Sequence, residues 1–174
     1  SESLVRSIPS YGRFLEIAAL TNGELVNFSG IASDCGVSST GIKGYFQILE
    51  DTLLGRFLPA FRKRAKRRQI LAPKFYFFDI GVVNHLARRG TISPGSELFG
   101  RAFEHLIFME LSAYLQYREK FLPLSYWKSI SGYEVDFILG EGEIAIEAKS
   151  SDVLHSRHLK SLRAFRDEYN PRRS

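Results

Sequence analysis

Two acidic residues and a lysine near the end of the chain have the types and the spacing of a hydrolytic site. Asp136 lies within the apolar run "YEVDFIL", and Glu147 and Lys149 lie within "EIAIEAKS". Because side chains alternate across a strand, Glu147 and Lys149 share one face, and Asp136 joins them if the two strands pair. Burying bare carboxylates is costly unless they are paired or bind a metal. The pattern therefore raises the question of what these carboxylates hold.

A divalent cation is one answer. Carboxylates, backbone carbonyls and waters are the ligands of Mg²⁺, and Mg²⁺ (or Mn²⁺) can activate a water and neutralise the charge of a phosphodiester. Lys149 would then hold the attacking water or stabilise developing negative charge. The alternative is an exposed sheet face on which Glu147 simply pairs with Lys149. The pattern alone favours this alternative, because an Asp followed about ten residues later by Glu-x-Lys often occurs by chance.

The elements that would position these residues follow from apolar periodicity. The segment "GRAFEHLIFMELSAYLQY" repeats apolar residues at the helical period, with Glu104 beside the apolar stripe. Three strands are predicted in "LSYWKS", "YEVDFIL" and "EIAIEAKS", with glycines between them. The segment "HLKSLRAFRDEY" predicts a closing helix. A helix, strands and a second helix indicate an α/β or α+β unit.

The first half of the chain predicts short helices. The segment "NFSGIASDCG" predicts a helix that Asn27 or Ser29 caps and Gly36 ends, and Ser38 or Ser39 caps the next helix. That helix has an apolar face of Ile42, Tyr45, Phe46 and Leu49, and a polar face of Thr40, Lys43 and Gln47. This is the helix-turn-helix pattern, in which the second helix contacts nucleic acid.

A basic run follows the predicted helix-turn-helix. Residues 53–60 and 69–78 predict extended arms, and the hairpin between them would form the wing of a winged helix. The run contains Arg62, Lys63, Arg64, Lys66, Arg67 and Arg68. Such a density of charge suits contact with phosphates, because affinity then comes from the release of counterions. The alternatives are a three-helix unit that packs against another domain and a basic edge that deters strand aggregation.

Composition bounds the partners and the location. The net charge is +5 and the estimated pI is about 9.4, which favours an anionic partner such as DNA or RNA. A single cysteine, Cys35, excludes an internal disulfide and predicts a reducing compartment, here the cytoplasm. No apolar run approaches the roughly 20 residues of a membrane span. The segment "GVSSTGIKG" lacks the Gly-Lys-Ser/Thr order of a phosphate loop, so no nucleotide-binding residue is predicted.

The acidic residues and their flanks carry a resemblance. The segments "VDF" and "IEAKSS", with "GRAFE" upstream, resemble the PD-(D/E)xK phosphodiesterase superfamily of restriction and repair nucleases. The resemblance implies that Asp136 and Glu147 bind the metal, that Lys149 is the catalytic lysine of the motif, and that Glu104 is the extra acidic residue from the first helix. All four residues would then belong to one catalytic site.

A longer resemblance covers almost the whole chain. The order of "FLEIAALTNGELVNFSGIASDCGVSSTGIKGYFQILEDTLL", "APKFYFFDIGVVNHL", "GRAFEHLIFMEL", "YWKS" and "GYEVDFIL…AIEAKSS" is similar to the C-terminal region of a family of prokaryotic AAA-type ATPases. In that family a winged helix and a nuclease-like domain follow a P-loop ATPase domain. The opening "SESLVRSIPS" would lie just past the ATPase domain, so we expect a fragment that does not itself bind ATP and whose partner in cis is the missing ATPase domain.

Together these observations predict an α/β (α+β) chain. A winged helix-turn-helix is expected over residues 11–70, and a restriction-endonuclease-like mixed sheet flanked by helices over residues 71–170. The predicted function is that of a module acting on nucleic acid, with Mg²⁺- or Mn²⁺-dependent hydrolysis of a phosphodiester. The alternative is a non-catalytic domain of the ATPase that binds DNA, RNA or protein in a regulatory role, or that forms homo-oligomers.

Overall fold

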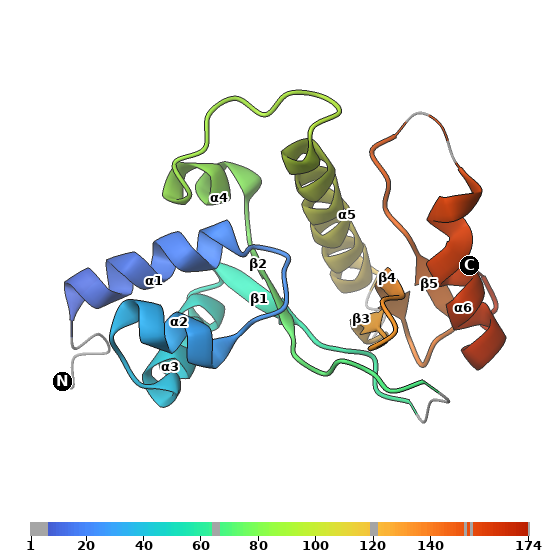
Figure 1. Ribbon diagram of the computed structural model, residues 1–174, viewed down its shortest axis with the longest axis horizontal. Helices are drawn as coiled ribbons and strands as arrows, with labels where there is room; N and C mark the ends of the chain where they lie inside the picture. Colours follow the sequence, from blue (N-terminus) through green and yellow to red (C-terminus); the bar gives the residue numbers. More distant parts are fainter. Residues whose placement is uncertain (1–6, 64–66, 119–121, 152, 154, 174) are drawn as a thin grey trace. The chain divides into compact units, whose positions relative to one another are not determined.

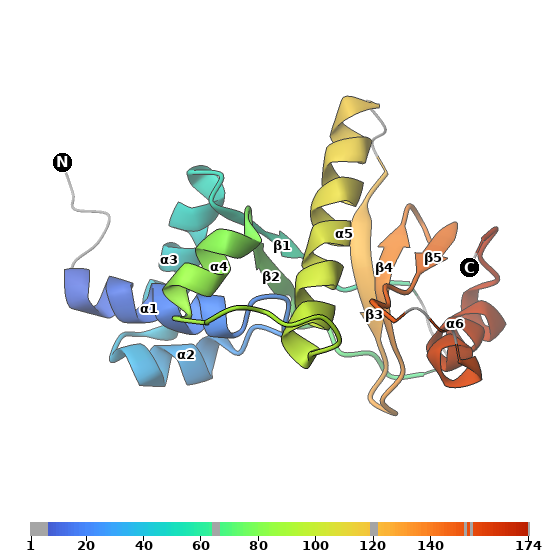
Figure 2. The ribbon, with the colours of Figure 1, turned by 90° about the horizontal axis from the view of Figure 1, so that it is seen from above.

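The computed structural model describes residues 7–63, 67–118, 122–151, 153 and 155–173 (Figures 1 and 2). These residues form helices and two small antiparallel sheets, which confirms the predicted α+β class. The chain divides into two compact units. The first comprises the chain up to Phe57 and Lys74–Thr91, and the second comprises Leu58–Pro73 and the chain from Ile92 onward. This division differs from the predicted boundary at residues 70 and 71, because the chain leaves the first unit after Phe57 and returns at Lys74.

Three helices build the first unit: α1 (Ile8–Leu20), α2 (Phe28–Cys35) and α3 (Ser39–Asp51). Of the two predicted alternatives for each cap, Asn27 caps α2 and Ser38 caps α3, and each side chain accepts the amide three residues on. Gly36 ends α2 in the left-handed conformation, with φ of 65°. The predicted apolar face of α3 is buried in the core of this unit. The helix-turn-helix arrangement is therefore set by local caps and by one apolar stripe.

A two-stranded sheet and a short helix complete the first unit. The strands are β1 (Gly55–Leu58) and β2 (Lys74–Phe77), and α4 (Ile80–Leu86) follows with Asp79 as its cap. Both strands are shorter than the predicted arms at 53–60 and 69–78. Gly55 permits their close approach, since a Cβ there would overlap the Phe75 ring and lie 2.7 Å from the Tyr76 carbonyl oxygen.

The second unit has a sheet between two helices. Its elements are α5 (Glu97–Tyr117), β3 (Leu124–Lys128), β4 (Glu134–Leu139), β5 (Ile144–Ile146), a 3₁₀ turn (Ser156–Leu159) and α6 (Lys160–Tyr169). The strands run antiparallel in the order β3-β4-β5, and Figures 1 and 2 both place them between α5 and α6. Single-residue bridges extend both edges, two of them parallel. None of the described helices combines the length and the apolarity needed to cross a membrane.

Residues 58–73, here called the strap, belong to the core of the second unit. Phe61 of the strap is 5% exposed and packs with Trp127 of β3 and Phe165 of α6 in the apolar cluster of this unit. Backbone bridges join Ala60 to Tyr126 and Gln69 to Ser129 along the edge of β3. This corrects the prediction of a basic wing tip on the first unit. The strap packs in the second unit because Phe61 is buried in the apolar cluster of that unit and because backbone bridges join the strap to the edge of β3.

Candidate functional site

The pairing of β4 with β5 brings the predicted acidic residues together. Their register joins Phe137 to Ile146 and Ile138 to Ala145. The backbone ladder stops there, and the amide of Ala148 instead donates to Oδ2 of Asp136 at 2.8 Å. A side chain of β4 thus holds the segment that carries Glu147 and Lys149. The strand β5 is shorter than predicted because a carboxylate replaces the next backbone acceptor.

Two carboxylates meet at one ammonium group. Nζ of Lys149 donates to Oε1 of Glu147 at 2.6 Å and lies 3.7 Å from Oδ2 of Asp136. The Asp136 side chain is 9% exposed and that of Glu147 12%, whereas 36% of Lys149 is exposed. The convergence expected from strand alternation is therefore present, and the group of Asp136, Glu147 and Lys149 is called the carboxylate cluster below.

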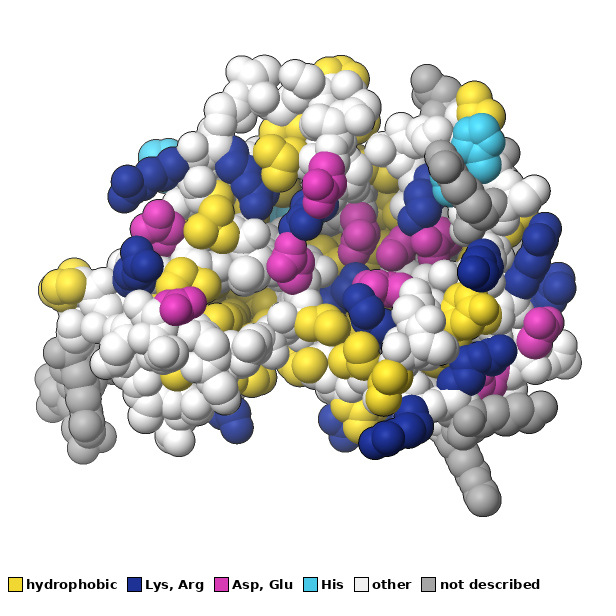
Figure 3. Space-filling view, in the orientation of Figure 1, with side chains coloured by type: hydrophobic (Ala, Val, Ile, Leu, Met, Phe, Trp, Pro, Cys, Tyr) yellow, Lys and Arg dark blue, Asp and Glu magenta, His cyan; other side chains and the backbone are white. Residues whose placement is uncertain are grey.

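The fourth predicted residue approaches from α5. Gly100 lies one turn before Glu104 in α5, and a Cβ at Gly100 would be 3.6 Å from Oγ of Ser150, directly after Lys149. The negative charge of Glu104 acts on the pKa values of the cluster. Figure 3 shows acidic side chains gathered on the surface between α5 and β5. Glu104 thus contributes to the electrostatics of the carboxylate cluster.

Burial and like charges shift the pKa values of this cluster. Burial, followed by the charges of Glu104 and Glu147, raises the pKa of Asp136 to about 7. The charge of Lys149 and the hydrogen bond from the Ala148 amide lower the pKa of Asp136, but they do not bring it back to its ordinary value. Burial also raises the pKa of Glu147, in spite of its bond to Lys149. For Lys149, burial acts to lower the pKa, but the bond to Glu147 and the surrounding negative charges outweigh it and raise the pKa.

The donor set fits a hard divalent cation. Among the described residues, Oε2 of Glu147 is a buried oxygen with no hydrogen-bond partner. No group of three or more His, Cys, Asp or Glu side chains in the described ranges is arranged to hold a metal as it stands. Mg²⁺, however, is usually bound through one or two carboxylates and completes its shell with waters and substrate phosphates. Asp136 and Glu147 match that requirement, with Glu104 acting through its charge.

The polar face predicted on α3 is exposed. Thr40, Lys43 and Gln47 all face solvent. Gln47 donates to Oδ1 of Asp51 at 2.9 Å, and Nζ of Lys43 lies 5.6 Å from the centre of the Phe28 ring. A groove of about 700 Å³ lies along this helix, with Thr40, Gln47 and Asp51 among its lining residues. The face is accessible, and its contact with nucleic acid stays a prediction.

The predicted basic run is divided in its roles. Arg62, Lys63 and Arg68 are exposed, and Lys63 donates to the carbonyl oxygen of Glu141 at 3.2 Å. Arg67 instead forms an ion pair with Glu168 of α6, with 2.6 Å between Nη1 and Oε2. Arg64 and Lys66 lie outside the described residues. The run therefore contributes both an anchor and exposed cations to the second unit.

The sequence-based prediction missed the cations of α6. Lys160, Arg163 and Arg166 are exposed and recur every third residue along this helix. The signal was present in "KSLRAFRDEY", where the helical prediction used only the apolar side. The same helix supplies Glu168, the buried partner of Arg67, which no local pattern marks.

These features define an α+β protein with a helix-turn-helix in its first unit and a carboxylate cluster in its second. Residues 2–93 match the family described as a domain of unknown function (DUF8612). The match spans more than half of the chain, and the chain belongs to this family.

Residues 99–174 match a second family, also described as a domain of unknown function (DUF4143) and commonly found in the C-terminal region of AAA-type ATPases. The predicted relation to that region is confirmed at this level. Neither description names an activity. No curated protein and no solved structure gives a significant match.

Proposed function

We propose that the second unit is a metal-dependent phosphodiesterase that acts on DNA or RNA, and that it serves as the C-terminal module of a prokaryotic, cytoplasmic AAA-type ATPase. One observation carries this proposal: Asp136 and Glu147, from neighbouring segments of one sheet, meet at the ammonium group of Lys149. This is the arrangement that the resemblance to PD-(D/E)xK nucleases requires of these residues. The fold by itself would not support an activity.

Each residue of the site has a role that follows from its surroundings. Asp136 and Glu147 would hold Mg²⁺ or Mn²⁺, and Glu104 adds negative charge that favours cation binding. The bound cation would activate a water and neutralise charge on the phosphodiester. Lys149 keeps its proton because its pKa is raised, so its ammonium group can hold the attacking water or stabilise a developing negative oxygen.

The first unit supports a role on nucleic acid. The second helix of its helix-turn-helix presents Thr40, Lys43 and Gln47 to solvent, where a recognition helix contacts the groove. The ATPase domain in cis would supply the energy for moving or opening the nucleic acid. This assignment rests on the match of the C-terminal part to DUF4143.

Metal binding tests the proposal directly. Titration calorimetry with Mg²⁺ and Mn²⁺ at pH 8 should detect a site that Asp136→Asn abolishes. The matched control is Asp167→Asn, which removes an exposed carboxylate of α6 and should leave the site intact. Nicking of plasmid, single-stranded and branched DNA, and of RNA, should then depend on the metal and on Asp136. A wild-type chain that takes up neither cation would rule the proposal out.

A second candidate is a non-catalytic arm of the ATPase. Lys149 already lies 2.6 Å from Glu147 and 3.7 Å from Asp136, so an internal cation neutralises part of the cluster. Such a cluster can be structural, and the domain would then bind DNA, RNA or protein, or form oligomers, without cutting. Binding of nucleic acid with no nicking in the presence of metal would favour this candidate over the first.

A further inference from the structure

The positive charge of the chain is concentrated in two segments. The strap and residues 155–174 contain twelve of the 24 Lys and Arg residues but only two of the 19 Asp and Glu residues. These segments therefore carry a net charge of +10, and the rest of the chain carries −5. Segregation of this kind points to a surface for an anionic partner, since evenly mixed charges would serve solubility equally well.

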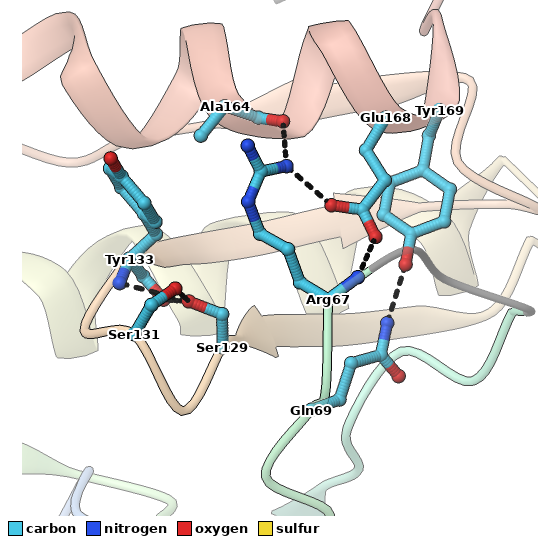
Figure 4. A network of polar contacts seen from close by, with 8 residues as sticks. All are labelled: Arg67, Gln69, Ser129, Ser131, Tyr133, Ala164, Glu168 and Tyr169. Atoms are coloured by element: carbon cyan, nitrogen blue, oxygen red, sulfur yellow. Dashed lines mark hydrogen bonds and ion pairs between the residues drawn. The ribbon is translucent and has the colours of Figure 1, made fainter.

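An ion pair fixes the strap against α6 (Figure 4). Nη1 of Arg67 donates to Oε2 of Glu168 at 2.6 Å and to the carbonyl oxygen of Ala164 at 3.3 Å. Oε1 of Glu168 accepts the backbone amide of Arg67 at 3.0 Å. The Glu168 side chain is 1% exposed and that of Arg67 is 36% exposed, so a buried carboxylate is paired with a partly exposed guanidinium. Arg67 acts as an anchor, and the cations beside it in the strap remain exposed.

Aromatic and amide contacts extend this attachment. The Phe61 ring lies 5.6 Å from that of Phe165 and 5.2 Å from that of Tyr169, measured between ring centres. The side-chain amide of Gln69 lies 2.6 Å from the Tyr169 hydroxyl (Figure 4). The ion pair and these contacts are together called the clamp. It holds the strap and α6 as one surface.

The C-terminal residues join the same surface. Arg173 forms backbone hydrogen bonds with Glu143 and Ala145 at the edge of β5. Lys63 of the strap reaches the neighbouring carbonyl oxygen of Glu141. The turn after β4 therefore lies between the strap and the end of the chain.

The exposed cations of these segments form what is called the cationic face. Its described members are Arg62, Lys63 and Arg68 of the strap, Lys160, Arg163 and Arg166 of α6, and Arg172 and Arg173. Figure 3 shows Lys and Arg side chains gathered over α6. Of the two acidic residues in α6, Glu168 is buried in the clamp, and Asp167 lies 3.9 Å from Arg166 in an exposed, weak pair. The face keeps a net positive charge.

We propose that the cationic face binds the phosphate backbone of a nucleic acid and leads it to the carboxylate cluster. Lys160 marks the connection, with its Nζ 5.5 Å from the centre of the Tyr133 ring. The hydroxyl of Ser161 accepts the amide of Glu134 at 3.3 Å, which fixes the start of α6 beside β4. Tyr133 and Asp136 are three residues apart, which is about 10 Å along a strand. Tyr133 packs on the α6 side of the sheet, whereas Asp136 is acted on by Glu104 of α5, so a bound backbone would pass around the sheet to reach the cluster. This inference rests on the proposed function for its second half.

The chemistry of the face favours a phosphate backbone as the partner. Its cations on α6 repeat every third residue, about 4.5 Å apart along the helix axis. Arg163 and its neighbours supply donors and positive charge, which can contact phosphate oxygens whatever the base sequence. Contacts of this type are independent of sequence and strongly dependent on salt. With a divalent cation bound, the adjacent cluster suits the oxygens of a phosphodiester.

The salt dependence of DNA binding tests the face. Fluorescence anisotropy would follow a labelled duplex and a labelled single strand, with EDTA present, over a range of KCl concentrations. Each lost phosphate contact lowers the slope of log K against log salt by about 0.9 for a duplex and about 0.7 for a single strand. The triple variant Lys160→Gln/Arg163→Gln/Arg166→Gln should lower the duplex slope by about 2–3. The matched control Arg13→Gln/Arg56→Gln/Arg88→Gln removes three exposed cations from the first unit and should leave the slope unchanged.

Further variants keep the outcome decisive. Arg163→Gln alone should lower the duplex slope by about 0.9. Trp127 fluorescence verifies that the second unit of each α6 variant is folded, and far-UV circular dichroism verifies the helices of the first-unit variants. An unchanged slope in the folded triple variant would overturn the inference. So would loss of all binding in Thr40→Ala/Lys43→Gln/Gln47→Ala, or competition by polyglutamate as strong as that by DNA.

The same series separates this inference from the proposed function. Asp136→Asn should retain metal-free binding and lose nicking. A wild-type chain that binds through α6 but never nicks would defeat the nuclease proposal and leave the cationic face standing. If the wild-type chain nicks DNA but the α6 substitutions leave its affinity for DNA unchanged, the nuclease proposal stands and the cationic face is ruled out.

Discussion

The second unit contains two buried acidic sites that are treated in opposite ways. In the clamp, both oxygens of Glu168 receive donors from Arg67, one from the backbone and one from the guanidinium. In the carboxylate cluster, Asp136 and Glu147 share the ammonium of Lys149, and Oε2 of Glu147 has no hydrogen-bond partner among the described residues. A buried charge whose bonds are complete serves the fold. One that is incompletely neutralised is a candidate for function.

The clamp is also the feature that joins distant parts of the sequence. Arg67 and Glu168 are separated by 101 positions, and the strap falls within the part of the chain that matches DUF8612, although it packs in the second unit. The carboxylate cluster, in contrast, comes from neighbouring strands. If the comparison holds, the clamp stabilises the second unit, and the carboxylate cluster lowers its free energy of unfolding.

Removing the aromatic anchor of the clamp should have the largest effect. Phe61→Ala should lower the free energy of unfolding of the second unit by about 3–5 kcal/mol, the usual cost of truncating a buried Phe. Trp127 is the single tryptophan of the chain and is fully buried beside Phe165, so its fluorescence reports this unit. Chemical denaturation followed at Trp127 measures the change.

Phe78→Ala is the matched control for this experiment. Phe78 is 44% exposed and follows β2 in the first unit, so its truncation should leave the Trp127 transition in place. Equal shifts for the two variants would contradict the assignment of the strap to the second unit. Such a result would instead favour the prediction that residues 58–73 form the wing of the first unit.

The ion pair of the clamp should contribute the next largest effect. Glu168→Gln keeps the shape of the side chain but replaces one oxygen by an amide that repels the donors of Arg67. Hydrogen bonds to charged groups contribute about 1.5–3 kcal/mol, so we expect a loss of about 2–3 kcal/mol in the same denaturation. Asp167→Asn changes the exposed neighbour in α6 and should leave the midpoint unchanged. An unchanged denaturation midpoint for Glu168→Gln would mean that the ion pair of the clamp does not stabilise the fold. The proposed difference between the clamp and the carboxylate cluster would then be wrong.

Local patterns predicted the first unit and the cluster well. Asn27, Gly36 and Ser38 act within a few residues, so caps and helix ends follow from the sequence. The alternation of side chains along paired strands likewise predicts that Asp136 and Glu147 converge on one side of the sheet. Both inferences need only short-range geometry.

The strap could not be predicted in the same way. Its basic residues resemble a hairpin tip, and nothing near them in sequence indicates a buried counter-ion. The position of the strap is instead set by its contacts with Phe165, Glu168 and Tyr169, which come about a hundred residues later in the chain. The early end of β5 was missed for a related reason, since a side chain of another strand captures the Ala148 amide.

The smallest effect is expected at the carboxylate cluster, and it has the opposite sign. Burial and the charges of Glu104 and Glu147 raise the pKa of Asp136 to about 7 from an ordinary value of 3.8. Between these values the folded state binds a proton that the unfolded state has released, so the free energy of unfolding falls as the pH rises through this window. Below the window the carboxyl is neutral in both states and costs nothing, and above it the full penalty applies.

Asp136→Asn should therefore stabilise the metal-free protein at pH 8, by on the order of 2 kcal/mol. This is about half of what the full pKa shift gives at about 1.36 kcal/mol per unit, because relaxation around a buried charge lowers its penalty. The amide oxygen can still accept the Ala148 amide, so the local fold is preserved. Denaturation with EDTA at pH 5 and pH 8 should give a gain that is larger at pH 8, while Asp167→Asn shows none at either pH. A variant less stable than wild type at pH 8 would mean that Lys149 satisfies Asp136 as fully as Arg67 satisfies Glu168. The two sites would then both be structural, and the cluster would have no unsatisfied charge for a metal to relieve.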